Sequence, residues 1–323
     1  MRSGGRPDAH SEGDAGTAAP SAPRAGRLPG SRFLDPAALA ALGDLRLAAR
    51  VAVDGVLDGL HRSRLPGAGM EFAQYRSYQP GDDLRRVDWR MYARSDRLHV
   101  REAETERSFT VRLLLDASAS MAHQEDGLSK FDYARFLVAS LALLARRQGD
   151  AVALVVVAGG GVSRLPARHG DQQLSRVLHT LEGLEPRGRW PAEAADVFLP
   201  GSGEGGAGLD VLVSDLDEDA DEIRAALRRA SPRHERLVFE LVGPRERALG
   251  WDAPRAFEDL ETGAIIEADP AAVRATYLRA RAARDAALEA ALGSAEARHA
   301  RVQVDQPLDG ALRTYLALRD RAG

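Results

Sequence analysis

The sequence predicts an α/β fold with a mostly parallel sheet flanked by helices. Between residues 108 and 242, short apolar runs alternate with longer segments of helical period, in the order strand, helix, strand, helix, strand, helix, strand. Two of the apolar runs, at 111–115 and 211–214, lead directly into Asp116 and Asp215. Because the C-terminal ends of parallel strands meet at one edge of a sheet, we expect these two carboxylates to lie together there.

The N-terminal part is expected to precede this fold. Residues 1–32 are rich in Gly, Ala, Pro, Ser and charge, lack the apolar core of a signal peptide and are predicted to be a disordered tail. Helical spacing of Leu, Val and Ala after Asp35-Pro36 predicts one long amphipathic helix over 35–62. Residues 66–94 show neither helical nor strand period and are too long for an ordinary loop. We assign 33–107 to an N-terminal unit.

The main domain is expected to span 108–245, and residues 246–323 to pack on it. Strands are predicted at 97–107, 108–115, 150–158 with a hairpin partner at 162–165, 209–214 and 236–242. Helices are predicted at 129–147, 171–184 and 219–230. The C-terminal part is predicted to hold a hairpin of 256–260 with 264–268, a helix at 270–297, a strand at 302–304 and a helix at 308–319.

Composition narrows the functional classes. The chain has 48 acidic and 44 basic residues and a formal charge of -4, so no global basic field indicates nucleic acid. It has no cysteine, which excludes disulfides and thiolate metal sites and fits a cytoplasmic location. No apolar stretch reaches the length of a membrane span. Lys130 is the only lysine.

The strand-end residues form a candidate cation site. Asp116, Ser118 and Ser120 occupy alternate positions of a segment leaving a strand, and Asp215 ends the neighbouring one. Carboxylate and hydroxyl oxygens suit Mg²⁺, Mn²⁺ or Ca²⁺ better than zinc. The alternative interpretation is that Asp116 caps the following helix and that Ser118, Ser120 and Asp215 satisfy loop amides.

A second candidate is the segment at 71–94, where acidic residues and arginines are interleaved with aromatic residues. Paired arginines and carboxylates can fix an irregular loop as a structural network. Arginine and tryptophan are also enriched at binding hot spots, so a docking surface is the functional alternative. The residues assigned to this partner-binding or structural role are Arg76, Asp82, Asp83, Arg85, Asp88, Trp89 and Arg94.

Two resemblances sharpen these expectations. The run 116–121 after an apolar strand resembles the metal-ion-dependent adhesion site of von Willebrand factor A domains, Asp-x-Ser-x-Ser, and Asp215 matches that family's later strand-end aspartate. The stretches 69–72, 76–89 and 93–94 resemble the signature of the bacterial domain-of-unknown-function-58 family, which couples this segment to an A-type domain.

The resemblance implies a Rossmann-like, von Willebrand factor A-like domain that binds a divalent cation, Mg²⁺ foremost. Asp116, Ser118 and Ser120 would hold the cation, with Asp215 acting through water. It also implies a non-catalytic adaptor that works with a MoxR-type AAA+ ATPase in assembly or maturation of protein complexes. A-type domains carry a threonine in the loop between the two motifs, and this chain has none from 181 to 261.

Two alternatives remain. A phosphatase similar to the haloacid dehalogenase class would also begin on Asp116, but it needs an acid where Ser118 stands. It also needs a lysine, and the place of Lys130 at the start of the first crossover helix does not suit that class. The missing threonine motivates the other alternative, a degenerate scaffold that binds no metal.

Overall fold

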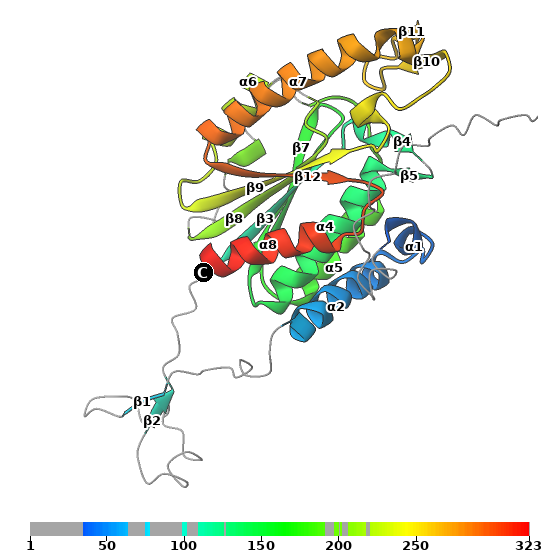
Figure 1. Cartoon of the computed structure of the whole chain (residues 1–323). Coiled ribbons are helices and arrows are strands. Elements are labelled where there is room, and N and C mark those ends of the chain that lie inside the picture. Colours follow the sequence, from blue (N-terminus) through cyan, green and yellow to red (C-terminus); the bar gives the residue numbers. More distant parts are fainter. Residues whose placement is uncertain are drawn as a thin grey trace, which may run out of the picture.

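The computed structural model describes residues 35–63, 75–77, 99–101, 109–125, 127–190, 197–199, 201, 206–217 and 220–322 (Figure 1). The tail expected at 1–32 lies outside the described residues, as does most of the segment 66–94. From the region between the N-terminal helices and the main sheet, the structure describes an antiparallel pair of β1 (Tyr75–Ser77) and β2 (His99–Arg101).

A six-stranded sheet forms the centre of the molecule (Figure 1). From edge to edge the strands are β12 (Ala297–Gln303), β9 (His234–Val242), β8 (Gly208–Ser214), β3 (Thr110–Asp116), β6 (Ala151–Ala158) and β7 (Gly161–Arg168). Neighbouring strands are parallel except β6 and β7, which form the hairpin predicted for this edge. The predicted α/β class with a mostly parallel sheet is confirmed.

Helices cover both faces of the sheet, as strands that are apolar on both sides require. One face carries α2 (Leu45–Ser63), α4 (Lys130–Arg147), α5 (Asp171–Glu182) and α8 (Asp309–Ala322), and the other carries α6 (Ala220–Arg228) and α7 (Pro270–Ser294). Alternate residues of β3 serve the two cores. Leu113 and Leu115 pack with the α4 side, and Leu114 packs with the α6 side.

Helix α4 lies at the centre of its face and begins as the sequence predicts. The Ser129 hydroxyl accepts a hydrogen bond from the Asp132 N–H at 2.9 Å, which caps the first turn. The helix ends before Gly149, whose φ of 82° is left-handed. Its apolar stripe is wide because it contacts the sheet, α2 and α5 together.

The long helix predicted at 35–62 is wrong as one element. The structure has α1 (Pro36–Ala40) and then α2, separated by a turn. Gly43 in that turn has a φ of 64°, and Asp44 Oδ1 accepts a hydrogen bond from the Leu47 N–H at 3.0 Å at the start of α2. A left-handed glycine followed by a capping aspartate restarts the helix in a new direction.

The C-terminal region differs from its prediction in one element. Helix α7 ends at Ser294, and Glu296 has a left-handed φ of 52°, so the helix does not reach 297. The chain continues as β12, longer than the expected strand at 302–304, and pairs with β9 along its length. The hairpin of β10 (Arg255–Glu258) and β11 (Ile265–Ala268) matches its prediction. No described helix has both the length and the apolar character needed to cross a membrane.

Candidate functional site

The two predicted carboxylates meet at the C-terminal edge of the sheet. Strand β3 ends on Asp116, and β8 ends one residue before Asp215. The strands pair in parallel with Leu115 opposite Val213, so Asp215 follows the strand end one residue beyond the level of Asp116. Both are buried, at 0% exposure for Asp116 and 5% for Asp215.

The two serines of the motif link these carboxylates. After Asp116 the chain turns into the short 3-10 helix η3 (Ala119–Ala122). The Ser118 N–H donates to Asp116 Oδ1 at 2.8 Å within the turn, but η3 has Ser118 at its N-cap and no side-chain cap, so Asp116 does not cap this helix as the alternative interpretation expected. Among the described contacts, neither serine hydroxyl bonds a loop amide. Ser118 Oγ lies 3.0 Å from Ser120 Oγ, and Ser120 Oγ donates to Asp215 Oδ1 at 3.3 Å.

Asp116 is held in a state that penalises its negative charge. Burial and the charge of Asp215 raise the pKa of Asp116 to about 6, although hydrogen bonds from Ser214 and Ser118 act in the lowering direction. The Ser214 hydroxyl donates to Asp116 Oδ2 at 2.5 Å. A nearby positive charge would stabilise the ionised form of a buried carboxylate of this kind. Ser214 was not among the predicted site residues, although it directly precedes Asp215 in the sequence.

Lys130 supplies a positive charge at this edge. Its Nζ lies 3.1 Å from Asp215 Oδ2 and 3.0 Å from Glu246 Oε2, and its side chain is 5% exposed. Burial alone would lower the pKa of Lys130, but the charges of Asp215 and Glu246 raise it above its ordinary value. The sequence analysis gave neither Lys130 nor Glu246 a role here. The available signal was that Lys130 is the only lysine in the chain.

The loop expected to carry a threonine lies against the motif. The Arg187 N–H donates to the Ala117 carbonyl at 2.9 Å, and the Ala119 N–H donates to the Gly188 carbonyl at 2.8 Å. Gly188 has a φ of 67°, and a Cβ there would lie 2.6 Å from Gly159 Cα. A β-branched residue at 188 is therefore opposed by the backbone conformation and by space.

The oxygens of the cluster suit a small hard cation. Neighbouring ligands of an octahedral Mg²⁺ lie about 3 Å apart. The Ser118 and Ser120 hydroxyl oxygens are separated by 3.0 Å, so these two groups can share one ion, and Asp215 Oδ1 lies 3.3 Å from Ser120 Oγ. Among the described residues, no group of three or more acidic or histidine side chains is arranged for a metal. A cation at Asp116 would therefore depend on hydroxyls and water as well as on carboxylates.

A groove of about 610 Å³ opens beside the cluster. Ser120, Lys130 and Asp215 lie along it, together with aromatic residues from the region of the β10–β11 hairpin. Trp251 and Phe257 meet edge to face with their ring centroids 5.6 Å apart. The groove therefore joins a charged oxygen cluster to an aromatic wall.

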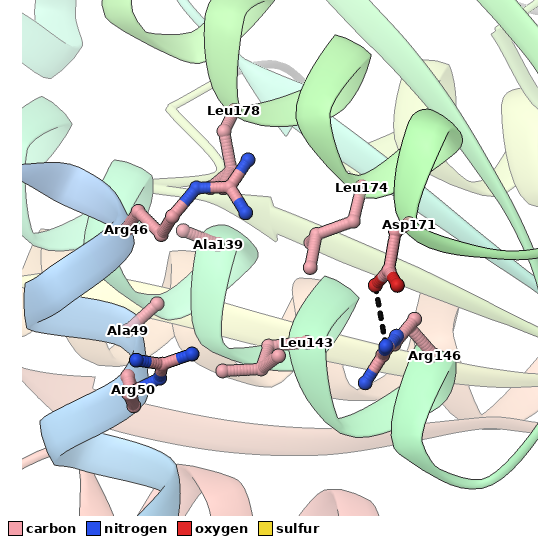
Figure 2. A pocket seen from close by; sticks show the side chains of 9 residues that line it. All are labelled: Arg46, Ala49, Arg50, Ala139, Leu143, Arg146, Asp171, Leu174 and Leu178. Carbon is pink, nitrogen blue, oxygen red and sulfur yellow. Dashed lines mark ion pairs between the residues drawn. The ribbon is translucent and has the colours of Figure 1, made fainter.

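A second hollow, of about 260 Å³, lies between α2, α4 and α5 and is shown in Figure 2. Its floor is apolar and its rim carries arginines. Arg46 Nη2 donates to Ser175 Oγ at 2.8 Å, and Arg146 pairs with Asp171 at 2.5 Å. Because these two arginines are engaged with neighbours and none of the cluster residues lines the hollow, we assign the functional site to the sheet edge.

The arginine and aspartate segment is mostly outside the described residues. Arg76 lies in β1, where its backbone pairs with Val100. The other predicted residues of the segment are outside the described part of the chain: Asp82, Asp83, Arg85, Asp88, Trp89 and Arg94. Their role as a structural network or a docking surface stays a prediction.

The fold and site define a Rossmann-like α/β module with an oxygen-rich cluster at the C-terminal edge of its sheet. The chain belongs to the family described as "Protein of unknown function DUF58", whose model matches residues 74–287. The family predicted from the signature segment and the strand-end motif is therefore confirmed.

Relatives include an uncharacterized protein of Mycobacterium tuberculosis (strain ATCC 25618 / H37Rv), Rv1480. It is 34% identical over 253 residues, which cover 77% of this chain and 79% of that protein. The uncharacterized protein YeaD of Bacillus subtilis (strain 168) is 29% identical over 126 residues, or 38% of this chain and 29% of that protein.

Solved structures show weaker likeness. The conserved hypothetical protein BatB of Bacteroides thetaiotaomicron is 17% identical with a TM-score of 0.41, covering 66% of this chain and 99% of that chain. The SpRpn10 VWA domain is 11% identical with a TM-score of 0.37, covering 64% and 94%.

Proposed function

We propose that this protein is a non-catalytic module that engages a protein partner through a divalent cation, Mg²⁺ foremost and Mn²⁺ or Ca²⁺ as alternatives. Asp116, Ser118 and Ser120 would hold the cation, with Asp215 bound to it through water. The cation would supply an open coordination position for a carboxylate of the partner. In line with the family resemblance, the proposed partner is a MoxR-type AAA+ ATPase, and the proposed role is assembly or maturation of protein complexes.

The observation that carries this proposal is the convergence of the Asp116, Ser118, Ser120 and Asp215 side chains at one strand edge. Contacts of 3.0 and 3.3 Å link the side-chain oxygens of Ser118, Ser120 and Asp215, the Ser118 N–H bonds Asp116, and Ser120 and Asp215 line a groove. An oxygen cluster of this kind favours a hard cation. The groove favours a protein segment as ligand, since its aromatic side chains can pack against apolar residues that flank the carboxylate.

The arrangement disfavours a phosphatase of the haloacid dehalogenase kind. Ser118 occupies the place of the required general acid. Lys130 pairs with Asp215 and Glu246, and among the described contacts its ammonium has no hydrogen bond to Asp116, the residue such an enzyme would phosphorylate.

The test is calorimetry with Mg²⁺, Mn²⁺ and Ca²⁺ on the full chain and on Asp116→Ala. Asp217→Ala is the matched control, because it removes the same charge from a residue that lines the groove but has no bond to the serine hydroxyls among the described contacts. We expect binding that is lost in Asp116→Ala and retained in Asp217→Ala. Absence of binding at millimolar metal would refute the cation site.

The partner is tested with a purified MoxR-type ATPase. We expect it to bind the wild-type chain in Mg²⁺ and to bind less in EDTA or to Asp116→Ala. Equal binding in all three cases would separate the cluster from docking. Hydrolysis of generic phosphoesters that requires Asp116 would favour the phosphatase instead.

A further inference from the structure

Lys130 is exceptional in this chain in both type and position. Of the 44 lysine and arginine residues in the chain, 43 are arginines and Lys130 is the one lysine. Lys130 is also the first residue of α4, where the positive end of the helix dipole disfavours a cation. A buried ammonium at that end has to be stabilised by the groups that it contacts.

Those groups are two carboxylates from separate elements. Asp215 follows β8, and Glu246 begins the 3-10 helix η5 (Glu246–Ala248) after β9. The Lys130 ammonium lies between them, at 3.1 Å and 3.0 Å from their oxygens. The Lys130 N–H also donates to the His123 carbonyl at 3.0 Å, which fixes the start of the helix beside the motif. Lys130 is therefore held in place by a backbone contact at the helix start and by two side-chain contacts of its ammonium.

The two carboxylate oxygens of Asp215 accept hydrogen bonds from two different groups. Oδ1 accepts the hydroxyl of Ser120, which belongs to the proposed cation cluster, and Oδ2 accepts the ammonium of Lys130. Any positive charge placed beside Asp215 on the Ser120 side is repelled by an ammonium that is already there. The same carboxylate charge cannot fully stabilise both cations.

We infer that Lys130 is a resident cation of this site and competes electrostatically with the divalent metal for the charge of Asp215. Lys130 then sets the concentration of divalent cation that the site requires. It lets the buried cluster persist when no metal is bound. The inference rests on the cation site put forward under the proposed function, and names the residue of this chain that tunes it.

The experiment compares metal affinity in variants that keep the charge balanced. Lys130→Met alone leaves the buried Asp215 and the half-buried Glu246 without their partner, so the double variant Lys130→Met/Glu246→Gln is the main test. Methionine matches the unbranched lysine stem, and glutamine keeps the shape of glutamate. Circular dichroism and urea unfolding establish that the variants are folded. Glu246→Gln alone is the matched control, because it retains the ammonium.

Calorimetry with Mg²⁺ and Mn²⁺ is the readout. We expect the double variant to bind these cations at least about tenfold more tightly than wild type, because the competing positive charge is gone. The Glu246→Gln variant alone is expected to bind the cations no more tightly than wild type, since it keeps the Lys130 ammonium, which then pairs with Asp215 only. Adding Asp116→Ala to the double variant is expected to abolish the gain. Equal affinity in wild type and double variant, or weaker affinity in the double variant, would overturn the inference.

The outcomes separate this inference from the proposed function. If wild type binds no metal at millimolar concentration and the double variant does, cation-dependent docking by the wild-type chain fails while the role of Lys130 stands. If both bind equally well, the cation site stands and the competition fails. If neither binds, both ideas are rejected.

Discussion

Replacing Gly188 with alanine tests how closely the loop at 187–190 is fitted to the motif. Gly188 has a left-handed φ of 67°, and its new Cβ would lie 2.6 Å from Gly159 Cα, 3.1 Å from Gly159 C and 3.2 Å from Gly159 N. All three contacts are to backbone, which cannot rotate away as a flexible side chain would. We expect Gly188→Ala to destabilise the fold and to displace this loop.

The magnitude follows from two separate costs. A left-handed conformation costs a non-glycine residue roughly 1–2 kcal/mol. Overpacking that forces backbone to shift adds about 1–3 kcal/mol. Gly263 is the matched control, because its φ of 71° is nearly the same and nothing lies within 4 Å of its Cβ position. Gly263→Ala is therefore expected to show only the first cost.

Urea unfolding followed by circular dichroism measures both variants. The free energy of unfolding should fall by about 2–5 kcal/mol for Gly188→Ala and by about 1–2 kcal/mol for Gly263→Ala. Calorimetry provides a second readout, since the Gly188 carbonyl accepts the Ala119 N–H between the two serines of the motif. Metal affinity should fall in Gly188→Ala and not in Gly263→Ala. Equal losses of stability in the two variants would refute the close approach.

Three further outcomes concern buried charges. In metal-free protein, Asp116→Asn should stabilise the fold above pH 6 by up to roughly 3 kcal/mol, because a carboxyl whose pKa is raised from 3.8 to about 6 loses stability as pH rises between those values. Urea unfolding at pH 5 and 8 checks this, and the gain should shrink at the lower pH. Arg112→Met should cost about 3–5 kcal/mol by leaving the buried Asp210 without its bidentate partner; adding Asp210→Asn should recover part of that loss in the same assay. Glu240→Gln should destabilise by about 1–3 kcal/mol at pH 7. Burial would raise the pKa of Glu240, but hydrogen bonds from His299 and a neighbouring arginine lower it, so this stability is present above the ordinary glutamate pKa and is lost as pH falls through the lowered one. Thermal unfolding between pH 3 and 7 should show the two proteins converging in acid.

The strands could be predicted because a strand buried on both faces forms a short apolar run in the sequence. β3 and β8 are buried at every position, and before the site residues at their ends each is mostly apolar and has one charged residue. Those charged residues, Arg112 and Asp210, pair with each other across the two strands. The sequence shows each charge but not the pairing, because strand order is a property of the whole sheet.

Only the end of β12, at 302–303, was predicted as a strand, because most of its side chains are polar. It holds Arg298, His299 and Arg301, which lack the apolar character of a central strand. As the edge strand it places His299 Nε2 2.9 Å and Arg301 Nε 2.7 Å from the buried Glu240. A glutamate inside the apolar run of β9 was the signal that a cationic neighbour was required.

The candidate site likewise contains residues that a local sequence pattern identifies and residues that only the structure identifies. Asp116, Ser118 and Ser120 fall within one turn, and Asp215 ends an apolar run, so a local pattern identifies all four. Glu246 has no such pattern. It meets Lys130 only because β9 returns the chain to the carboxyl edge of the sheet. Sequence patterns identified the residues proposed to bind a cation, whereas the pairing of Lys130 with Asp215 and Glu246 required the three-dimensional structure.

This division bears on how the module would act. A structural metal site is usually tied to folding, because its ligands repel one another until the ion binds. Here Lys130 already neutralises Asp215, while Asp116 is relieved by the hydroxyl of Ser214 and the N–H of Ser118. The fold therefore has its own means of keeping the cluster together. A divalent cation would then add a coordination position for a partner without being needed for the integrity of the sheet, which is the behaviour expected of a docking site.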